Sequence, residues 1–589
     1  MKEYSKSLKY NYYYNSENES ISYSDGSAVE DEIFNIIKNV EDKSVLSDEL
    51  ANKICDWPTE YHFSKSRHCL LRPLPFSKND SILELGCGCG AITRYLGETG
   101  ADVDSVEGTY SRARVAGERC SELSNVSVFV DDLLEFESNK LYDWVLFIGV
   151  LEYAPIFSKE KDAVQHYLNQ AKKYLKPNGK LVVAIENKLG LKYFNGCGED
   201  HVSELYFGIE NRYSKIGPIT FGKEELSLVL NNAGFSHLEY YYPFPDYKLP
   251  NTIVHESAFY CNTFEVSELL RGLHSRDYSG KIFRAFDESF VWPELEKNNL
   301  IDSLSNSFLV IAENSPSNFG NELAWSYNVN RQKRYTTETI FKINNSDILV
   351  SKYLLSPESK KNIYVKELNE KYIEGKSIQT LLENVWHKTK NKENLSDIYQ
   401  IWLDFVIDKS DYSEVKDICK AKIDACYIDL TPFNVKYHNG NIDFFDQEWD
   451  FCRKIPLMWL IFRGVYWSFY KFNTIHHLDI NIDLELQELL KNKNVSEFNI
   501  NDFIEMEKTF LLDVNGFDTE INLKIQKFPS RFHLLEESLH NLKIENKEII
   551  NKKVDLENEV EALNITLRQF ELSLTNRIVK KLKRILKII

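Results

Sequence analysis

The stretch SILELGCGCGAITRYLGETG, residues 81–100, decides the fold of this 589-residue chain. Its first five residues are typical of a buried strand, and AITRYLGETG is typical of a helix. The junction between them carries Glu84 and three glycines, Gly86, Gly88 and Gly90. Glycines at such a junction let the backbone approach a ligand closely, because no Cβ stands in the way. The pattern predicts a nucleotide-like ligand at this strand end, and a tight turn without a ligand is the alternative.

Two classes of cofactor fit the glycines of this junction. Gly86, Gly88 and Ala91 also satisfy the spacing of a dinucleotide-binding turn. Glu84 opposes that interpretation, because a carboxylate so close would repel a diphosphate. S-adenosylmethionine has no phosphate and carries an ammonium and a sulfonium, so a negative loop suits it. We therefore expect Glu84, Gly86, Gly88 and Gly90 to bind S-adenosylmethionine.

Four further apolar runs continue the pattern along the chain. Helix-like segments separate DVDSVE (102–107), VSVFV (126–130), YDWVLFI (142–148) and LVVAI (181–185). This alternation predicts an α/β fold, a doubly wound parallel sheet of the Rossmann type. The prolines of PFPDYKLP (243–250) predict an extended exit from the domain. We place the domain at residues 31–250, after a polar leader of residues 1–30.

Residues 81–242 resemble the class I S-adenosylmethionine-dependent methyltransferases in the order of their motifs. The resemblance implies that Glu107, which closes DVDSVE, binds both ribose hydroxyls. It implies that Asp132 takes the adenine amino group, with its neighbour Asp131 as the alternative. YDWVLFIGVLEYAP resembles the family's fourth motif, and LKPNGKLVVAIEN (175–187) resembles the turn and strand that follow it. The fourth motif implies a cleft lined by Gly149, Leu151 and Glu152.

Methyl transfer is an in-line displacement that needs an unprotonated acceptor atom about 3 Å from the methyl group, and it requires no metal. Segment 187–202 leaves the fifth strand at the end where ligands bind, and it contains Asp200 beside His201. We predict His201 as the base or the group that orients the acceptor, in a catalytic set with Asp200 and Glu152. A packing or surface role for His201 is the alternative. A phosphate acceptor is already ionised and would need no base.

A second region, residues 251–460, is organised differently. LAWSY (323–327), TTETIFKI (336–343) and ILVSKYLL (348–355) follow one another through short turns, which predicts an antiparallel meander. Helical segments dominate afterwards, and we assign residues 461–530 to a helical extension of this region.

The segment YIDLTPFNVKYHNGNIDFFDQEW (427–449) carries the chemistry of the second region. Its layout resembles the catalytic loop of small-molecule kinases related to aminoglycoside and choline kinases. The resemblance implies a protein-kinase-like α+β domain in which Asp429 receives the proton of the acceptor hydroxyl, while Asn434 and Asp446 hold Mg²⁺. It also places Glu374, in KYIEGKSIQTLL (371–382), in the hinge that binds the adenine of ATP, and it makes Lys352 a phosphate ligand.

The second region departs from the kinase pattern at three points. Tyr427 stands where the loop usually has histidine, the turn NVNRQKR (328–334) has no glycine, and only about 20 residues separate Lys352 from the hinge. Two interpretations of the second region therefore stay open. It is either an active kinase that uses ATP and Mg²⁺ or an inactive relative that recognises the acceptor.

The tail has a regular apolar seam. Its apolar residues recur every seven positions at Leu535, Leu542, Ile549, Leu556, Leu563 and Phe570. This spacing predicts a coiled coil over residues 531–576 and therefore a homo-oligomer. Residues 577–589 combine an apolar helix side with a basic one, which favours an anionic membrane surface or a partner helix, such as one of a membrane-bound glycosyltransferase. A plain charged helix end is the alternative.

Composition limits the classes of partner. The formal charge of −18 opposes binding to nucleic acid. No run of about 18 apolar residues could span a bilayer, the first 25 residues lack the order of a secretion signal, and the ten cysteines are scattered. We expect a cytoplasmic protein, with peripheral attachment at the inner face of the cell membrane through its tail.

The order of methyltransferase, kinase-like domain and coiled coil resembles the bifunctional enzymes that cap the growing end of bacterial O-antigen polysaccharides. It implies methylation of a surface-glycan terminus or its lipid-linked precursor, coupled to phosphorylation of that acceptor. One alternative is a small-molecule or protein methyltransferase whose second domain recognises the acceptor. The other is a non-catalytic scaffold that acts through its tail.

Overall fold

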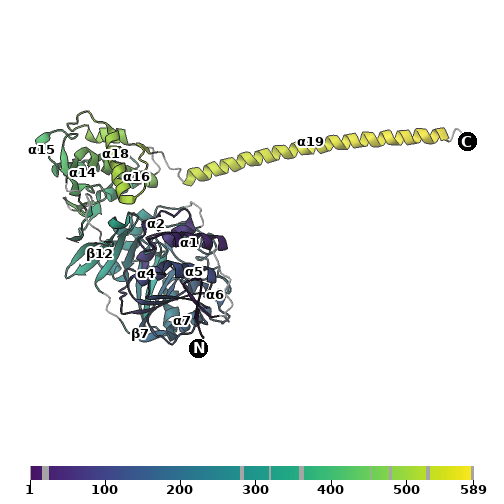
Figure 1. The fold of residues 1–589 in the computed structure, drawn as a ribbon. Helices are drawn as coiled ribbons and strands as arrows, with labels where there is room; N and C mark the ends of the chain where they lie inside the picture. The colour runs from purple at the N-terminus through teal and green to yellow at the C-terminus, as the bar shows by residue number, and fades with distance from the viewer. Residues whose placement is uncertain are drawn as a thin grey trace. The chain divides into compact units, whose positions relative to one another are not determined.

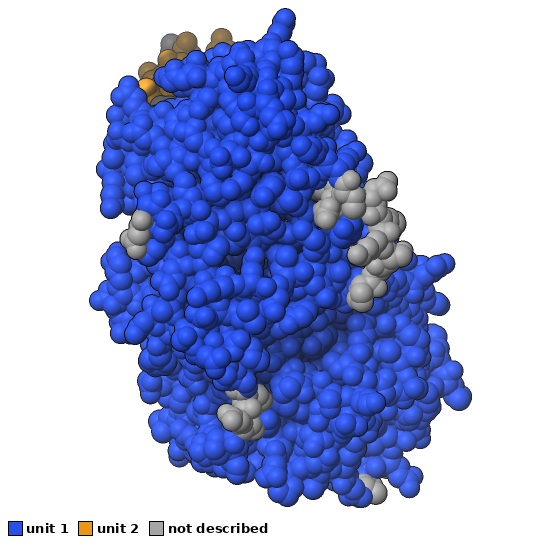
Figure 2. Space-filling view, turned by 90° about the vertical axis from the view of Figure 1, so that its left-hand side faces the viewer, with its two compact units in different colours: residues 1–475, 480–525 blue, residues 476–479, 526–589 orange. Residues whose placement is uncertain are grey.

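A computed structural model describes residues 2–15, 26–278, 284–316, 320–356, 364–438, 440–450, 453–476, 480–525 and 531–585. The chain divides into two compact units, one of residues 1–475 and 480–525 and one of residues 476–479 and 526–589 (Figure 2). Part of the predicted leader (16–25) and the last four residues of the predicted basic helix (586–589) lie outside the described residues. Among the described helices, none has the length and apolar character needed to cross a membrane.

A parallel sheet forms the centre of the first unit, and its strands match the five predicted ones. They are β3 (Ser81–Leu85), β4 (Asp102–Glu107), β5 (Val126–Val130), β6 (Tyr142–Ile148) and β7 (Leu175–Glu186). Their spatial order is β5-β4-β3-β6-β7, so the direction of progression reverses between β3 and β6. In open α/β sheets, ligands bind at the carboxyl ends of the strands beside such a reversal.

Helices cover both faces of this sheet, which explains why its strands are continuous apolar runs. Alternate residues of β3 point to opposite faces, since Leu83 joins one buried cluster and Ile82 the other. The first face is covered by α7 (Ala163–Lys173) and α9 (Lys223–Asn232), and the second by α4 (Ala91–Glu98) and a 3₁₀ turn, Arg67–Leu71. Helices α7 and α4 are labelled in Figure 1. Helix α5 (Tyr110–Arg119) packs against α1 (Ser27–Asn39).

Antiparallel strands extend the sheet far beyond residue 250. Strand β10 (Ser307–Glu313) lies between β7 and β8 (His237–Phe244) and pairs with both in antiparallel sense. Beyond β8 follow β9 (Thr252–His255), β11 (Glu322–Asn328), β12 (Thr337–Asn344), β13 (Asp347–Leu354) and β15 (Leu368–Lys371). The predicted meander is confirmed by β11, β12 and β13. The boundary expected at residue 250 falls between two neighbouring strands of one sheet, and segment 243–250 comprises the end of β8 and its connection to β9.

Residues 2–15 belong to the opposite edge of the same sheet. Strand β2 (Tyr13–Tyr14) pairs in parallel with β5 and in antiparallel with β1 (Ser5–Lys6). The described part of the leader is therefore structured. Its aromatic side chains pack on the sheet, as Tyr13 stacks on Phe129 with ring centroids 5.3 Å apart.

The second region has a helical part that follows the meander. A three-stranded sheet joins β16 (Lys376–Ser377) to the hairpin β18 (Val435–His438) and β19 (Asn441–Phe444). The longer helices are α13 (Ile378–Thr389), α14 (Ser396–Asp408), α16 (Leu457–His476), α17 (Ile482–Leu490) and α18 (Ile500–Asn515). The expected boundary at residues 460–461 lies inside α16.

The tail is one 55-residue helix, α19 (Arg531–Ile585). The helix runs through the predicted coiled coil and most of the predicted basic segment. Its seam residues Leu542, Leu563 and Phe570 are exposed in the single chain. A helix with an exposed apolar seam agrees with the coiled coil, whose pairing with a second chain stays a prediction.

Candidate active site

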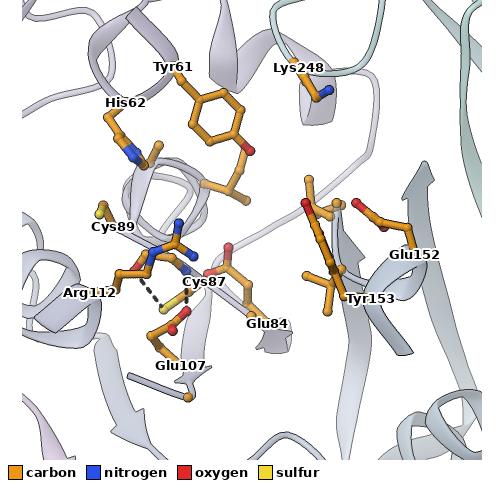
Figure 3. A pocket seen from close by; sticks show the side chains of 18 of the residues that line it. Tyr61, His62, Glu84, Cys87, Cys89, Glu107, Arg112, Glu152, Tyr153 and Lys248 are labelled. Carbon is orange, nitrogen blue, oxygen red and sulfur yellow. Dashed lines mark hydrogen bonds between the residues drawn. The ribbon is translucent and has the colours of Figure 1, made fainter. Parts of the chain in front are cut away.

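A cavity of about 520 Å³ opens at the carboxyl ends of β3, β4 and β6. Its volume lies within the ~300–1,000 Å³ typical of ligand sites. Figure 3 shows its two sides, with Glu84, Glu107 and Arg112 on one and Glu152, Tyr153 and Lys248 on the other. The predicted residues that line it are Glu84, Gly86, Gly88, Glu107, Gly149, Glu152, Asp200 and His201.

The three glycines of the first turn have different roles. All have positive φ, but a Cβ on Gly88 would meet no protein atom within 4 Å, because Gly88 faces the open cavity. A Cβ on Gly86 would lie 2.6 Å from Val150 Cγ2. Gly90 does not line the cavity, and its Cβ would lie 2.8 Å from Ala116 Cα. Its assignment to the cofactor is corrected, since Gly90 allows α4 and α5 to pack closely.

Two carboxylates flank this turn. Glu84 is buried, and the hydroxyls of Thr93 and Ser105 donate to its Oε2 at 2.6 and 2.8 Å. Burial raises the pKa of Glu84 to about 7, so the negative rim expected at this position is only partly charged at neutral pH. Glu107 accepts hydrogen bonds from the Gly88 N–H at 2.9 Å and from the Thr109 N–H at 3.1 Å. These bonds fix the Glu107 carboxylate at the end of β4, where the ribose contact is predicted.

Contacts with the leader bear on the choice between Asp131 and Asp132 as the predicted adenine-binding residue. Asp131 is buried and accepts a hydrogen bond from Lys2 Nζ at 3.0 Å and another from the Tyr4 hydroxyl. Asp132 accepts from the Leu134 N–H at 2.8 Å, and burial raises its pKa. Neither aspartate lines the cavity, but Leu133 does. Asp132 is the better placed of the two because Asp131 is already engaged by the leader.

The fourth motif contributes two of its three predicted residues. Gly149, at φ +72°, lines the cavity, and a Cβ there would lie 2.7 Å from the Tyr247 hydroxyl. Glu152 also lines the cavity. The prediction for Leu151 is wrong, because this side chain points into the hydrophobic core and is fully buried.

The wall opposite the glycine turn joins Glu152 to Glu186 and His201. One ligand atom from each of these residues lies within 4.8 Å of the others. Burial and the neighbouring Glu186 carboxylate raise the pKa of Glu152 to about 8. Burial would lower the pKa of His201, but the Glu186 carboxylate, 3.4 Å from His201 Nε2, raises it to about 9. Without a bound cation, this favours the protonated form of His201 and disfavours its predicted role as the base, and its part in catalysis stays a prediction.

Asp200 is also unsuited to remove a proton. Its carboxylate is buried and lies 2.8 Å from Lys192 Nζ and 2.5 Å from Lys248 Nζ. Burial would raise the pKa of Asp200, but these two ammonium groups lower it below its usual value. The residue holds Lys248 at the cavity wall, where Lys248 also contacts Glu186 at 2.8 Å.

Several lining residues were not predicted from the sequence. Helix α3 (Trp57–Phe63) brings Trp57 and Tyr61 to the cavity, and the turn after it brings Arg67. Arg67 Nη1 donates to the carbonyl of Tyr247 at 3.1 Å. The capping box formed by Asp56 and Thr59 marks the start of α3, but no local pattern indicates which way the Trp57 ring points.

The predicted phosphate lysine of the second region is part of a buried ion-pair network. Lys352, on β13, contacts Asp446 and lies 2.7 Å from Glu448 Oε2. Arg331, from the turn between β11 and β12, lies 2.7 Å from the other oxygen of Glu448. Glu448 therefore pairs with two cations, Lys352 and Arg331, in this network.

The predicted catalytic-loop residues of the second region lie near this network. The Asn434 side-chain amide donates to the Asp429 carbonyl at 3.2 Å, and Arg463 lies 3.0 Å from the Asp429 carboxylate. A cavity of about 150 Å³ is lined by Lys352, Asp446 and residues 371–373 of the predicted hinge, whereas Glu374 is exposed and outside it. That volume is below the ~300 Å³ expected of a site for a drug-sized ligand.

Comparison with known proteins finds methyltransferases that match part of the first region. Residues 83–181 match the family model described as a methyltransferase domain. A segment is 31% identical over 117 residues to the ubiquinone biosynthesis O-methyltransferase of Rickettsia akari (strain Hartford), covering 20% of this chain and 43% of that protein. The demethylmenaquinone methyltransferase of Tropheryma whipplei (strain Twist) is 28% identical over 118 residues, or 20% of this chain and 46% of that protein. The match thus spans less than half the length of these relatives.

Among solved structures, phosphoethanolamine N-methyltransferase 2 of Haemonchus contortus in complex with S-adenosyl-L-methionine is 17% identical, with a TM-score of 0.26. The similarity covers 43% of this chain and 53% of that one. The family match and the identity to O-methyltransferases agree with the parallel sheet and the glycine turn beside its reversal point. Residues 83–181 therefore form a class I S-adenosylmethionine-dependent methyltransferase domain.

Proposed function

We propose that this protein methylates an oxygen at the terminus of a surface glycan or of its lipid-linked precursor. The observation that carries the proposal is a single cavity lined on one side by Gly88 and Glu107 and on the other by Glu152 and His201. The first side would hold S-adenosylmethionine and the second would receive the acceptor, so that donor and acceptor meet in one cavity.

Aromatic rings at the mouth of the cavity support a ring-shaped acceptor. Trp57 is 37% exposed, and it lines the cavity. Its ring centroid lies 4.4 Å from that of Tyr278 and 5.6 Å from that of Tyr61. Flat apolar faces with polar edges suit the faces of sugar rings. They also suit a quinol ring, so a small-molecule acceptor like those named for the quinone-pathway relatives is the second candidate.

A substrate test separates these candidates. Purified full-length protein with S-adenosylmethionine is offered oligosaccharides with a free terminal hydroxyl, the same oligosaccharides phosphorylated at the terminus, and quinols, and S-adenosylhomocysteine is measured. We expect turnover with an oligosaccharide. Turnover with quinols alone would make the protein a small-molecule methyltransferase. Calorimetric binding of NADH without binding of S-adenosylmethionine would refute the cofactor assignment as well.

We further propose that the second region phosphorylates the same acceptor before it is methylated. The proposal is supported by Lys352 and Asp446 in contact on one side of the small cavity and by Asn434 bonded to the Asp429 backbone nearby. Such groups hold metal and phosphate and receive the acceptor proton in phosphotransferases. With ATP, Mg²⁺ and oligosaccharide, Asp429→Asn should abolish phosphate incorporation and leave S-adenosylmethionine binding unchanged. Incorporation that survives this change would remove the kinase proposal.

The tail supports a location beside the membrane. A paired α19 would leave its basic end, with Lys580, Lys581, Lys583 and Arg584, available to an anionic surface or to a helix of a glycosyltransferase. Cosedimentation with vesicles that contain anionic lipid, compared with neutral vesicles, tests the first of these partners.

A further inference from the structure

We propose that Glu152, Glu186 and His201 form a binding site for a divalent first-row metal ion, best suited to Mn²⁺, on the acceptor side of the cavity. The inference rests on the proposed function, because it assigns the means by which the acceptor oxygen is held. The three residues come from three separate segments: the turn after β6, the end of β7 and the loop that follows it.

The spacing of the three ligand atoms fits one ion. They lie within 4.8 Å of one another. Two ligands at ~2.2 Å from a metal are separated by about 3 Å when they are adjacent and about 4.4 Å when they are opposite. A small shift of side chains would therefore bring all three onto one centre. The remaining coordination positions face the cavity, because Glu152 and His201 both line it.

Glu152 is a buried carboxylate that points to a ligand. Only 1% of the residue is exposed, and neither carboxylate oxygen has a hydrogen-bond partner among the described residues. Figure 3 shows its side chain at the edge of the cavity beside Tyr153. A buried carboxylate without partners is costly, and a bound cation removes that cost.

The surroundings of His201 and Glu186 resemble the outer shell of a metal site. The Tyr153 hydroxyl lies 3.1 Å from His201 Nδ1, which leaves Nε2 directed at Glu186 Oε2 across 3.4 Å. Metal-bound histidines are commonly held in this way through their second nitrogen. Lys248 lies 2.8 Å from Glu186 Oε1 and keeps that carboxylate oriented while the second oxygen stays available.

Donor chemistry selects the class of ion. One imidazole nitrogen and two carboxylate oxygens suit Mn²⁺ or Fe²⁺ better than Mg²⁺ or Ca²⁺, which prefer oxygen alone. Two carboxylates supply the charge that balances a divalent ion. Where the acceptor is an anionic phosphate, the ion would add to the positive charge of Lys248 at this wall and offset the negative charges of Glu152 and Glu186.

The ion would bind an oxygen of the acceptor and hold it facing the methyl group of the donor. The new bond forms between the methyl carbon and the acceptor oxygen as the carbon–sulfur bond breaks. The bonding pair stays on sulfur, which leaves neutral S-adenosylhomocysteine. A hydroxyl acceptor loses its proton to water, and a phosphate acceptor has none to lose.

Electron paramagnetic resonance of Mn²⁺ tests the site without relying on turnover. Full-length protein carrying Asp446→Asn, which removes the predicted metal ligand of the second region, is titrated with Mn²⁺ alone. We expect one bound ion per chain and nitrogen modulation from a single imidazole. Adding His201→Gln should remove the nitrogen signal, and adding Glu152→Gln should weaken binding at least tenfold. The exposed Glu160→Gln is the matched control and should leave binding unchanged.

Three results would overturn the metal site. They are no bound Mn²⁺ at millimolar concentration, a signal without nitrogen coupling, or equal affinity in Glu152→Gln and Glu160→Gln. Melting temperatures of all variants show whether each one folds. If His201→Gln does not fold, the isosteric Glu152→Gln still tests the metal site. S-adenosylmethionine binding is measured in parallel. Loss of the metal result with retained cofactor binding refutes the metal site alone, whereas absent cofactor binding refutes the proposed function.

Discussion

Alanine substitutions at two glycines of the first turn, Gly88 and Gly90, should rank in opposite order for loss of stability and for loss of cofactor affinity. Both have positive φ, +55° and +76°, so alanine at either position costs roughly 1–2 kcal/mol of backbone strain. At Gly90 the new Cβ would also lie 2.8 Å from Ala116 Cα and 2.9 Å from Ala116 Cβ. Such overpacking against backbone adds about 1–3 kcal/mol. Gly90→Ala should therefore lose about 2–5 kcal/mol of stability and Gly88→Ala about 1–2 kcal/mol.

Cofactor affinity should follow the reverse order. The Cβ of Gly88→Ala would stand in the open cavity, where the backbone must approach S-adenosylmethionine closely. We expect a tenfold or greater loss of affinity, about 1.4 kcal/mol. Gly90→Ala, where it folds, should bind nearly as tightly as the parent protein.

Thermal unfolding and titration calorimetry measure both effects in one pair of variants. A destabilisation of 1 kcal/mol shifts the melting temperature of a domain of this size by ~2–4 °C. Gly90→Ala should therefore melt at least about 2 °C below Gly88→Ala. Equal melting temperatures, or unchanged cofactor affinity in Gly88→Ala, would refute the separation of packing from binding in this turn.

Three further changes probe other parts of the chain. Glu107→Gln should weaken S-adenosylmethionine binding about 10- to 100-fold, because charge-assisted hydrogen bonds to the ribose hydroxyls are lost. Calorimetry measures the affinity, and an unchanged affinity would show that the ribose binds elsewhere. Because burial raises the pKa of Glu84 from 4.5 to about 7, its proton stabilises the fold by about 3 kcal/mol below pH 4.5, and that contribution is lost as the pH rises through 7. Urea unfolding of Glu84→Gln between about pH 5 and pH 8 should lack this decline, and a decline equal to that of the parent would assign it to another group. Removal of residues 526–589 should convert an oligomer into a monomer in sedimentation equilibrium, whereas an unchanged mass would place the contact outside the tail.

The strands of the central sheet could be predicted because both of their faces are buried. SILEL and YDWVLFI are continuous apolar runs for that reason, and glycines mark the turn that follows the first. Strand β10, SFLVIAE, is a similar run in which every residue is buried, but the run does not indicate which strands it pairs with. It pairs with β7 and β8, whose residues are far away in the sequence, so the position of β10 in the sheet could not be predicted from its own residues. For the same reason, the pairing of β8 with β9 across residue 250 could not be read from the local sequence.

Site residues were predictable where the sheet itself places them. Glu107 ends a strand beside the reversal point, so its position at the cavity follows from topology. Leu151 lies in a short 3₁₀ turn, where tertiary packing alone decides which side chain faces the core. Glu186 was passed over because it closes LVVAIE as one more strand residue, although it stands at the same carboxyl edge as Glu107.

Because His201 is disfavoured as the base, the role of Glu152 on the acceptor side becomes the main question. That role depends on whether the acceptor is a hydroxyl or a phosphate. A hydroxyl acceptor must lose its proton, so Glu152→Gln should lower kcat by ~10²–10⁴ where Glu152 holds the ion that binds the acceptor oxygen. A phosphate oxygen is ionised beforehand, so the same variant should raise KM and leave kcat within about threefold of the parent. Steady-state kinetics on a terminal hydroxyl and on its phosphorylated form measure both parameters. A fall in kcat with the phosphorylated acceptor would show that Glu152 acts in the transition state, which would contradict a role limited to holding an ionised acceptor.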